Sequence, residues 1–387
     1  DDDQPGSILS DFETLLNFVE DGVRSTGKYH LLPMAKLFEL DGLMTNPLRP
    51  RLKRPQQRSF PHLNGLYVLL RATQLGAAEG QGKSTGRLTL DPAMHAQWRS
   101  LNATERYFNL LEAWLRLGRR QMVGLGSGGY WDNIGIRTRD LWTDISAKGL
   151  CFSAKESRRG YLFSCTEQAA ELALLELFGL VTVERYKPAE GEGWLVRAVR
   201  RTPFGTKLFK LVLAEIRVEL YGDREWHPKF GVWQPLLQSE FPLWKNNLKI
   251  PEHEFRDGVF YFKVSLGTPW RRIAIPAESD LDALAESIIE AFGFTGNHLY
   301  GFHLTARDGR AMRVEHPYVD ETDMYTDEVR IGDLPLYDRN TMLFQYDFGA
   351  NWRFDVQLEK TEAVNAKIVE PTIVASCGKA PPEYDEW

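Results

Sequence analysis

The sequence predicts an α+β protein, with a mostly helical, winged-helix-like N-terminal part followed by a C-terminal α+β domain in which a helix packs on a mainly antiparallel sheet. Three observations lead to this prediction. Apolar residues between Ile8 and Val19 recur at the spacing of one helix face. A helical pattern, two strand patterns and another helical pattern follow one another between residues 164 and 213. Apolar and polar residues then alternate at 259–266, as they do in a half-buried strand.

The chain of 387 residues is long enough for two or three domains of the usual size, about 100–200 residues each. We expect a helical, winged-helix-like domain at 1–120 and a second winged-helix-like domain at 121–220. Aromatic residues and prolines without a regular period at 221–254 predict an irregular, packed linker. The C-terminal α+β domain is expected at 255–387.

The composition is that of an ordinary soluble protein, with 43% hydrophobic and 26% charged residues. No apolar run approaches the roughly 18–20 residues that span a bilayer, so we expect no membrane association. The start, Asp1-Asp2-Asp3, does not resemble a signal peptide, and because it lacks Met a fragment of a longer protein is one interpretation. The sparse cysteines, without C-x-x-C spacing, fit the cytoplasm and predict neither a zinc site nor disulfides.

Helical patterns dominate the first part of the chain. The apolar face at 8–19 is followed by a second short helix at 31–40. A strongly amphipathic helix is expected at 63–75, a short strand at 87–90, and a further helix after Asp91, with proline at its first position. This order of helix, turn, strand and helix predicts the first winged-helix-like unit.

A strongly basic segment lies at 49–58. Pro50 and Pro55 keep it out of a helix, so we expect an exposed loop. One interpretation is an arm that contacts phosphates, because Lys and Arg gain affinity by releasing counterions from nucleic acid. The alternative is a solvated loop that keeps the chain soluble. The candidate nucleic-acid-binding residues of this loop are Arg49, Arg51, Lys53, Arg54 and Arg58.

The second winged-helix-like unit has a clearer pattern. A helix ending near Phe178 is followed by strands at 180–184 and 194–199 and by a helix that begins at Thr202. With Leu-Phe-Gly-Leu-Val before the hairpin and Arg-x-Thr-Pro-Phe-Gly after it, the segment is similar to many bacterial winged-helix modules. In such modules a helix enters the major groove of DNA and the hairpin, or wing, contacts the backbone.

Basic side chains on this unit complete the candidate nucleic-acid interface. The net charge of −6 argues against binding of polyanions over the whole surface, but a local basic patch is compatible with it. Glu190 and Glu192 at the tip of the wing would repel phosphate, and winged helices also serve as protein–protein platforms. DNA contact and protein contact are therefore both retained as hypotheses. The candidate residues here are Arg197, Arg200, Arg201 and Lys207.

The C-terminal domain shows strand patterns on both sides of one helix. Strands are predicted at 259–266 and 270–275, then a helix capped by Ser279, then strands at 299–305 and 312–315. This order predicts a helix that covers an antiparallel or mixed sheet.

A β-hairpin is predicted near the end of the chain. Strand-like runs at 342–346 and 354–358 flank Asp347, Gly349 and Asn351, residue types that tight turns use because they tolerate unusual backbone angles. The aromatic residues at the neck of this hairpin are expected either to fill a core or to belong to a site.

Several ordered motifs in the last third of the chain carry a family resemblance: Pro-Trp-Arg-Arg-Ile from 269, a helix ending in Phe-Gly-Phe, His-Leu from 298, Tyr-Asp-Phe-Gly from 346, and a tail with Pro-Pro-Glu from 381. Over about 255–387 the chain resembles the plasmid pRiA4b ORF-3-like family, also met as an insertion-element passenger protein. Ala350 stands where the family usually has Asp, and Phe354 where a His is common. The family motif residues are here Trp270, Arg271, Arg272, His298, Tyr346, Asp347, Phe348, Gly349 and Trp352.

These features predict a non-enzymatic, multidomain DNA- or protein-binding protein of bacterial mobile-element or defence type, located in the cytoplasm. Its partners would be DNA and a protein bound by the C-terminal domain, with no cofactor, no metal and no catalytic residue. One alternative is a metal-dependent, nuclease- or recombinase-like DNA-processing enzyme that uses His298 with Asp347 as ligands. The other is a purely structural adaptor.

Overall fold

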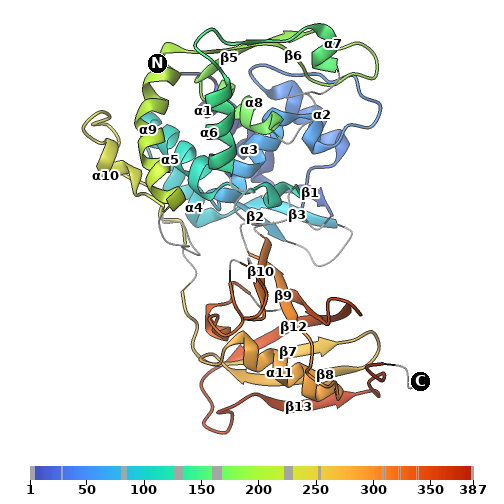
Figure 1. Ribbon diagram of the computed structural model, residues 1–387. Coiled ribbons are helices and arrows are strands. Elements are labelled where there is room, and N and C mark those ends of the chain that lie inside the picture. Colours follow the sequence, from blue (N-terminus) through green and yellow to red (C-terminus); the bar gives the residue numbers. More distant parts are fainter. Residues whose placement is uncertain are drawn as a thin grey trace. The chain divides into compact units, whose positions relative to one another are not determined.

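The structure is a computed structural model that describes residues 5–27, 29–79, 85–125, 134–158, 168–221, 230–251, 254–306, 309, 311–320, 322, 324–336, 338 and 340–384. The chain divides into two compact units (Figure 1). Unit 1 is Asp1–Pro251 and unit 2 is Glu252–Trp387. Helices and an antiparallel sheet confirm the predicted α+β class.

Unit 1 begins with a helix, a strand, two helices and a hairpin, which we call the first repeat. Its three strands form an antiparallel sheet in the order β1-β3-β2. The predicted helices and the strand at 87–90 are all present, with shifted ends. The elements are α1 (Ile8–Glu20), β1 (Val23–Thr26), α2 (Met34–Leu43), a short 3-10 turn η1 (Gln57–Ser59), α3 (Pro61–Ala72), β2 (Gly76–Glu79) and β3 (Thr85–Leu90).

A second repeat has the same order of elements. Its strands pair in the equivalent order β4-β6-β5. The two small sheets lie on opposite sides of the helices of unit 1 (Figure 1). The elements of the second repeat are α6 (Ile134–Asp144), β4 (Leu150–Cys151), α7 (Ala154–Arg158), α8 (Ala169–Leu177), β5 (Val181–Tyr186) and β6 (Leu195–Arg201).

The remaining elements of unit 1 join or flank the repeats. Asn102 and Glu105 form the capping box of α5, in which each side chain accepts from the backbone of the other. The elements are α4 (Pro92–Ser100), α5 (Ala103–Glu112), a π turn η2 (Ala113–Leu117), a 3-10 turn η3 (Arg120–Val123), α9 (Pro203–Tyr221) and α10 (Trp233–Leu237).

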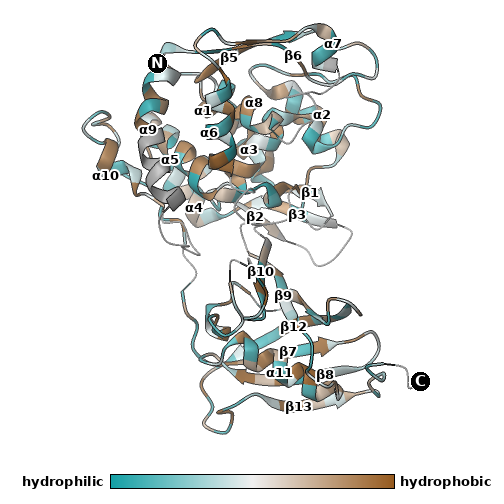
Figure 2. Ribbon diagram, viewed as in Figure 1, coloured by the Kyte–Doolittle hydropathy of each residue, from teal (hydrophilic) through white to brown (hydrophobic). Residues whose placement is uncertain are grey.

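Helix α3 of the first repeat packs against helix α8 of the second. Every residue of α3 is buried. Gly65 permits the close approach, because a Cβ atom at this position would lie 2.6 Å from Cγ of Leu174 on α8. One apolar cluster runs from Ile8 to Leu248, and hydrophobic stretches gather where the helices of unit 1 meet (Figure 2). The two repeats therefore share a core.

Residues 230–251, which the sequence analysis assigns to a linker, pack onto α5. Trp233 and Trp244 are fully buried. Glu105 Oε1 accepts hydrogen bonds from the backbone N–H groups of residues 245 and 246, and Glu112 Oε1 accepts from those of residues 232 and 233. Side chains of α5 therefore satisfy backbone donors of this segment that neither α10 nor a sheet pairs.

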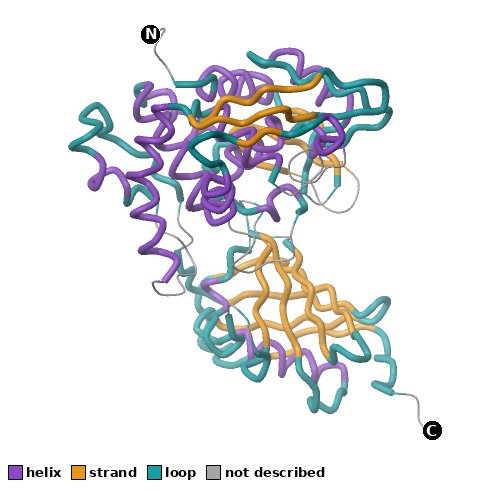
Figure 3. Tube along the Cα trace, turned by 45° about the horizontal axis from the view of Figure 1, so that its top comes forward, coloured by secondary structure: helices purple, strands orange, loops and turns teal. Residues whose placement is uncertain are grey.

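Unit 2 contains a seven-stranded antiparallel sheet and one long helix, α11 (Leu281–Phe292). The helix lies along one face of the sheet (Figure 3). The strand order is β10-β9-β11-β12-β7-β8-β13. The strands are β7 (Val259–Ser265), β8 (Trp270–Pro276), β9 (Tyr300–Thr305), β10 (Ala311–Glu315), β11 (Thr341–Tyr346), β12 (Trp352–Glu362) and β13 (Thr372–Cys377).

Helix α11 packs an apolar face onto the sheet through side chains such as Leu284, Ile288 and Phe292. Its N-cap is Asp280, which accepts from the backbone N–H of Ala283 at 2.8 Å, so the predicted cap at Ser279 was one residue early. The sheet face away from α11 carries mostly polar side chains.

Candidate functional site

The basic loop, residues 49–58, follows α2, and its last two residues belong to η1. All five of its predicted basic side chains are exposed. The buried carboxylate of Asp41 holds the start of the loop. Its Oδ1 accepts from the backbone N–H of Leu48 and its Oδ2 from that of Arg49, both at 2.9 Å. His62 Nε2 on α3 lies 2.9 Å from Asp41 Oδ1. Burial by itself raises the pKa of Asp41, but His62 and the two backbone donors hold that pKa below its usual value.

The tip of the β5–β6 hairpin meets this loop. Arg51 N donates to Glu192 O at 2.9 Å, and Gly191 N donates to Arg51 O at 3.0 Å. The Arg51 guanidinium also lies 3.7 Å from the Glu190 carboxylate. A loop of the first repeat and the hairpin of the second therefore form one surface, which sequence spacing alone did not indicate.

These contacts change the interpretation of the acidic hairpin tip. The Glu192 carboxylate accepts from the backbone N–H of Ala189 at 2.7 Å and so caps its own turn. Glu190 lies beside Arg51. Both carboxylates have local partners, so their repulsion of a phosphate is smaller than the sequence suggests.

The other predicted basic residues lie on β6 (Arg197, Arg200 and Arg201) and on α9 (Lys207). Together with those of the basic loop they fall into two groups. Arg200 pairs with Glu184 on the neighbouring strand, and Arg201 stacks 4.5 Å above the Trp142 ring. The second group has exposed side chains and, within the described part of the chain, no ion pair. It consists of Arg197 and Lys207 together with Arg49, Lys53, Arg54 and Arg58 of the basic loop.

The helices that would read a DNA groove in winged-helix modules are covered. Those helices are α3 and α8, which pack on each other. In this arrangement neither presents a face that can enter a major groove. The packing of α3 on α8 therefore gives the expected insertion of a helix no support.

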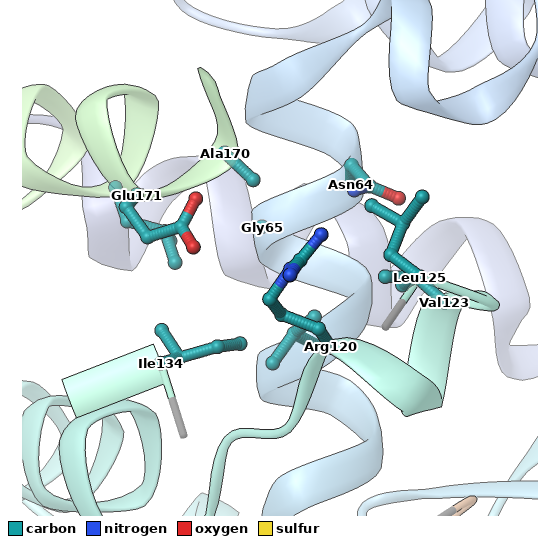
Figure 4. Close-up of a pocket in the computed structure, with 10 residues that line it drawn as sticks. Asn64, Gly65, Arg120, Val123, Leu125, Ile134, Ala170 and Glu171 are labelled. Carbon is teal, nitrogen blue, oxygen red and sulfur yellow. The ribbon is translucent and has the colours of Figure 1, made fainter. Parts of the chain in front are cut away.

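A cavity of about 10 Å³ lies between α3 and α8. Figure 4 shows the Arg120 side chain reaching between Glu171 and Asn64. Burial raises the pKa of Glu171 to about 7, against the opposing influence of Arg137 and Arg120. The volume suits about one water molecule, so the cavity is not a site for an organic ligand.

In unit 2 the family motif on β8 places its side chains on both sheet faces. Arg271 faces α11, donates to Ala291 O at 2.8 Å near the end of the helix, and reaches Cys377 O at 3.2 Å. Trp270 and Arg272 lie on the opposite face, where Arg272 forms a two-pronged ion pair with Glu359. Arg271 therefore ties helix, strand and tail together, which is a structural role.

The predicted hairpin is confirmed, and its turn holds the second motif. Asp347 has a positive φ of 50°, and its Oδ1 accepts from the N–H groups of Gly349 at 2.9 Å and Ala350 at 3.1 Å. Its Oδ2 accepts from the Tyr384 hydroxyl at 2.5 Å. This hydrogen bond is the main reason why the pKa of Asp347 is lowered. Phe348 is exposed beside the turn.

Glu383 of the C-terminal tail, which is not among the candidate residues, holds the tail to the same hairpin. Glu383 accepts from Thr295 N at 2.6 Å and from the Tyr346 hydroxyl at 3.0 Å. Trp352 packs edge-on against Phe294, with 5.0 Å between ring centroids. The Pro-Pro-Glu motif in the sequence was the available signal for Glu383.

His298 lies beside this cluster, with Nδ1 3.7 Å from Asp347 Oδ2. The structure thus brings together the two residues that the enzyme hypothesis uses. Among the described residues, no group of three or more His, Cys, Asp and Glu side chains is placed to hold a metal ion.

Comparison with known proteins identifies the C-terminal part. Residues 261–385 match the model of the family described as plasmid pRiA4b ORF-3-like protein. These residues form a pRiA4b ORF-3-like domain. The match lies within unit 2 and includes the β11–β12 hairpin, the β8 motif and the C-terminal tail with Glu383.

A solved structure also resembles the chain: a protein of unknown function from Methanosarcina mazei Go1, 24% identical, with a TM-score of 0.30, covering 33% of this chain and 73% of that one. A search of curated proteins found no match. Within the described residues, no helix is both long and apolar enough to cross a bilayer.

Proposed function

We propose that unit 1 binds duplex DNA through its phosphate backbone, using the basic loop and the β5–β6 hairpin as one contact surface. The observation that carries this proposal is the pair of backbone hydrogen bonds between Arg51 and the hairpin tip. They hold the exposed basic loop against the tip of the hairpin whose strand β6 carries the exposed Arg197, and this combined surface would neutralise several phosphates of one duplex together.

The repeated order of elements supports a winged-helix ancestry for both repeats of unit 1. Helix, strand, two helices and a hairpin, with the first strand beside the third, is the arrangement expected of such modules. Because α3 and α8 cover each other, the binding mode differs from helix insertion. Contacts made by loop and wing are backbone contacts, so we expect weak dependence on base sequence.

The charge distribution favours unit 1 as the DNA-binding part. Residues 1–251 contain 34 Lys and Arg against 28 Asp and Glu, a net charge of +6, whereas residues 252–387 contain 13 against 25, a net charge of −12. An acidic unit repels a polyanion at long range. The family match of unit 2 further supports a plasmid or mobile-element protein. A role of unit 2 as its protein-interaction module is part of the proposal.

The test measures binding of the full chain to a fluorescent duplex by anisotropy across a salt series. The variant carries Lys53→Ala, Arg54→Ala and Arg58→Ala. Its control carries Arg99→Ala, Lys245→Ala and Lys249→Ala, which remove the same charge from exposed positions elsewhere on unit 1. If each lost contact releases about 0.9 counterion, the slope of log affinity against log salt falls by about 2–3 only in the first variant.

Three results would oppose the proposal. They are no binding by the wild type at low salt, equal loss in both variants, and strong discrimination between duplex sequences. The last would show that bases are read directly and that α3 or α8 becomes exposed.

The enzyme alternative rests on the proximity of His298 and Asp347. Incubating plasmid DNA with the protein and Mg²⁺ or Mn²⁺ tests it. Nicking that is lost in Asp347→Asn, while DNA affinity is unchanged, would favour a DNA-processing enzyme over a binding protein.

A further inference from the structure

Glu171, on α8, carries a carboxyl group that is buried where the two repeats of unit 1 meet. Its side chain is 2% exposed. Among the residues that the structure describes, neither of its oxygens finds a hydrogen-bond donor. Arg137 Nε lies 3.4 Å from Glu171 Oε1, as an ion pair without the alignment of a hydrogen bond. A buried charge without hydrogen bonds costs free energy, whereas the protonated carboxyl group costs much less.

The surroundings of Glu171 come from three other elements. Within the described part of the chain, the charged groups that face it are Arg137 of α6 and Arg120 of η3. Helix α3 contributes Asn64 and Gly65, neither of which titrates. Figure 4 shows the carboxylate pointing toward α3 and the Arg120 side chain. The cavity of about 10 Å³ between them has room for about one water molecule, too few to hydrate an ionised carboxylate.

This buried carboxyl group lies at the contact that joins the repeats. Leu174, three residues after Glu171, is on the same side of α8 and packs over Gly65 of α3. A Cβ atom at Gly65 would lie 2.6 Å from Leu174 Cγ, so the two helices leave no space for solvent there. Water therefore reaches the Glu171 carboxylate only when α3 and α8 separate.

We propose that Glu171 makes the contact between the two repeats depend on pH: its protonated form keeps α3 and α8 closed, and loss of the proton favours their separation. The inference goes beyond DNA binding and does not depend on it. A proton favours whichever state binds it more tightly. Burial next to only two cations makes the closed state that one, because the separated state hydrates the carboxylate.

The direction and the range of the effect follow from the pKa. Burial raises the pKa of Glu171 in the closed state to about 7, although Arg137 and Arg120 act to lower it. In the separated state we expect the ordinary value of about 4.5. The stabilisation of the closed state is therefore complete below about pH 4.5 and is lost as pH rises through 7.

The test measures hydrogen exchange of the full chain by mass spectrometry at pH 6 and pH 8. Rates are converted to protection factors, which removes the pH dependence of the intrinsic exchange rate. With pKa values of about 7 and 4.5 in the two states, the opening constant of α3 and α8 is expected to rise about tenfold over this interval. Glu171→Gln carries a neutral side chain of similar size and is expected to abolish the rise.

Glu112 provides a matched control in the same unit. Burial raises its pKa to about 7 as well, but it lies on α5 and accepts from the backbone of residues 232 and 233. Glu112→Gln is expected to leave the pH dependence of α3 and α8 as in the wild type.

Three results would overturn the proposal. They are wild-type protection of α3 and α8 that is equal at pH 6 and pH 8, a tenfold rise in opening that persists in Glu171→Gln, and equal loss of the rise in both variants. The last would mean that α3 and α8 exchange only when all of unit 1 unfolds. The wild-type comparison alone decides the first point if Glu171→Gln does not fold.

Discussion

The two units stabilise their irregular segments in different ways. Among the described residues, unit 1 buries nine Asp, Glu, His and Arg side chains, whereas unit 2 buries Glu315 and Asp347. The nine are Asp11, Asp41, His62, Arg71, Glu105, Glu112, Arg116, Arg120 and Glu171. Four of the carboxylates in unit 1 accept hydrogen bonds from loop backbones. Unit 2 instead pairs seven strands in one sheet, although Asp347 and Glu383 also accept from loop backbone N–H groups. Helical units with long connections need buried side-chain acceptors, whereas a continuous sheet supplies its own.

We expect the largest loss of stability from a change in the core that the two repeats of unit 1 share. Leu174→Ala removes the side chain that packs over Gly65 and is expected to cost about 2–5 kcal/mol in unit 1. Hydrogen exchange followed by mass spectrometry should show faster exchange in both repeats and no change in unit 2. Leu236→Ala, at an exposed position, is the control. Faster exchange in only one repeat would mean that the repeats fold independently.

Glu112 allows a test of the buried carboxylates through pH. Burial raises its pKa to about 7 from a usual value near 4.5. A raised pKa stabilises the protein fully below about pH 4.5, and the contribution is lost as pH rises through 7. The shift corresponds to roughly 3 kcal/mol.

The measurement compares urea unfolding of the wild type and Glu112→Gln between pH 5 and pH 8. We expect the wild type to lose stability relative to the variant over this interval. Glu240→Gln, an exposed carboxyl in the same unit, controls for the loss of one charge. If the difference in the free energy of unfolding between wild type and Glu112→Gln is constant from pH 5 to pH 8, the raised pKa of Glu112 is wrong.

Asp41 tests whether a buried carboxylate positions the DNA-binding loop. Asp41→Asn retains one acceptor for the two backbone donors at Leu48 and Arg49, and is expected to cost about 1–3 kcal/mol. Faster amide exchange at residues 48–52 and weaker DNA binding should accompany each other. Because the native pKa is lowered, the stabilisation by Asp41 is present above about pH 4 and is lost below it. Unchanged amide exchange at residues 48–52 would show that the Asp41 carboxylate does not position the loop.

We expect the smallest loss of stability from a change in the C-terminal tail of unit 2, which Tyr384 joins to Asp347. Tyr384→Phe removes the hydroxyl that donates to Asp347 and is expected to have only a small effect on stability, because the tail is exposed. Amide exchange at Gly349 and Ala350 should rise, while unit 1 is unaffected. Tyr318→Phe, on a highly exposed ring, should change neither.

Local patterns predicted the elements well where one physical signal dominates. Alternation predicted β7, and the Asp-x-Gly turn predicted the hairpin in which Asp347 adopts a positive φ. The family motifs indicated a pRiA4b ORF-3-like domain, which the family match confirms. The cap of α11 was misplaced by one residue because Ser279 and Asp280 are both good capping residues.

Contacts between segments that are distant in the chain could not be predicted from the sequence. Nothing local shows that Arg51 binds the hairpin tip, that Glu105 and Glu112 hold residues 230–251, or that Glu383 accepts from Tyr346. The division of residues 1–220 into two domains stays a prediction.

The sequence by itself determined the class, the positions of most helices and strands, the exposed basic loop and the family of the last third, because these depend on periodicity, turn chemistry and ordered motifs within short windows. The tertiary structure decided which surfaces are available. It covered α3 with α8, joined the basic loop to the hairpin, and gave the outer side of β13 no backbone partner among the described residues. Packing between segments that are distant in sequence depends on shape and buried polar partners, which no short window of sequence contains.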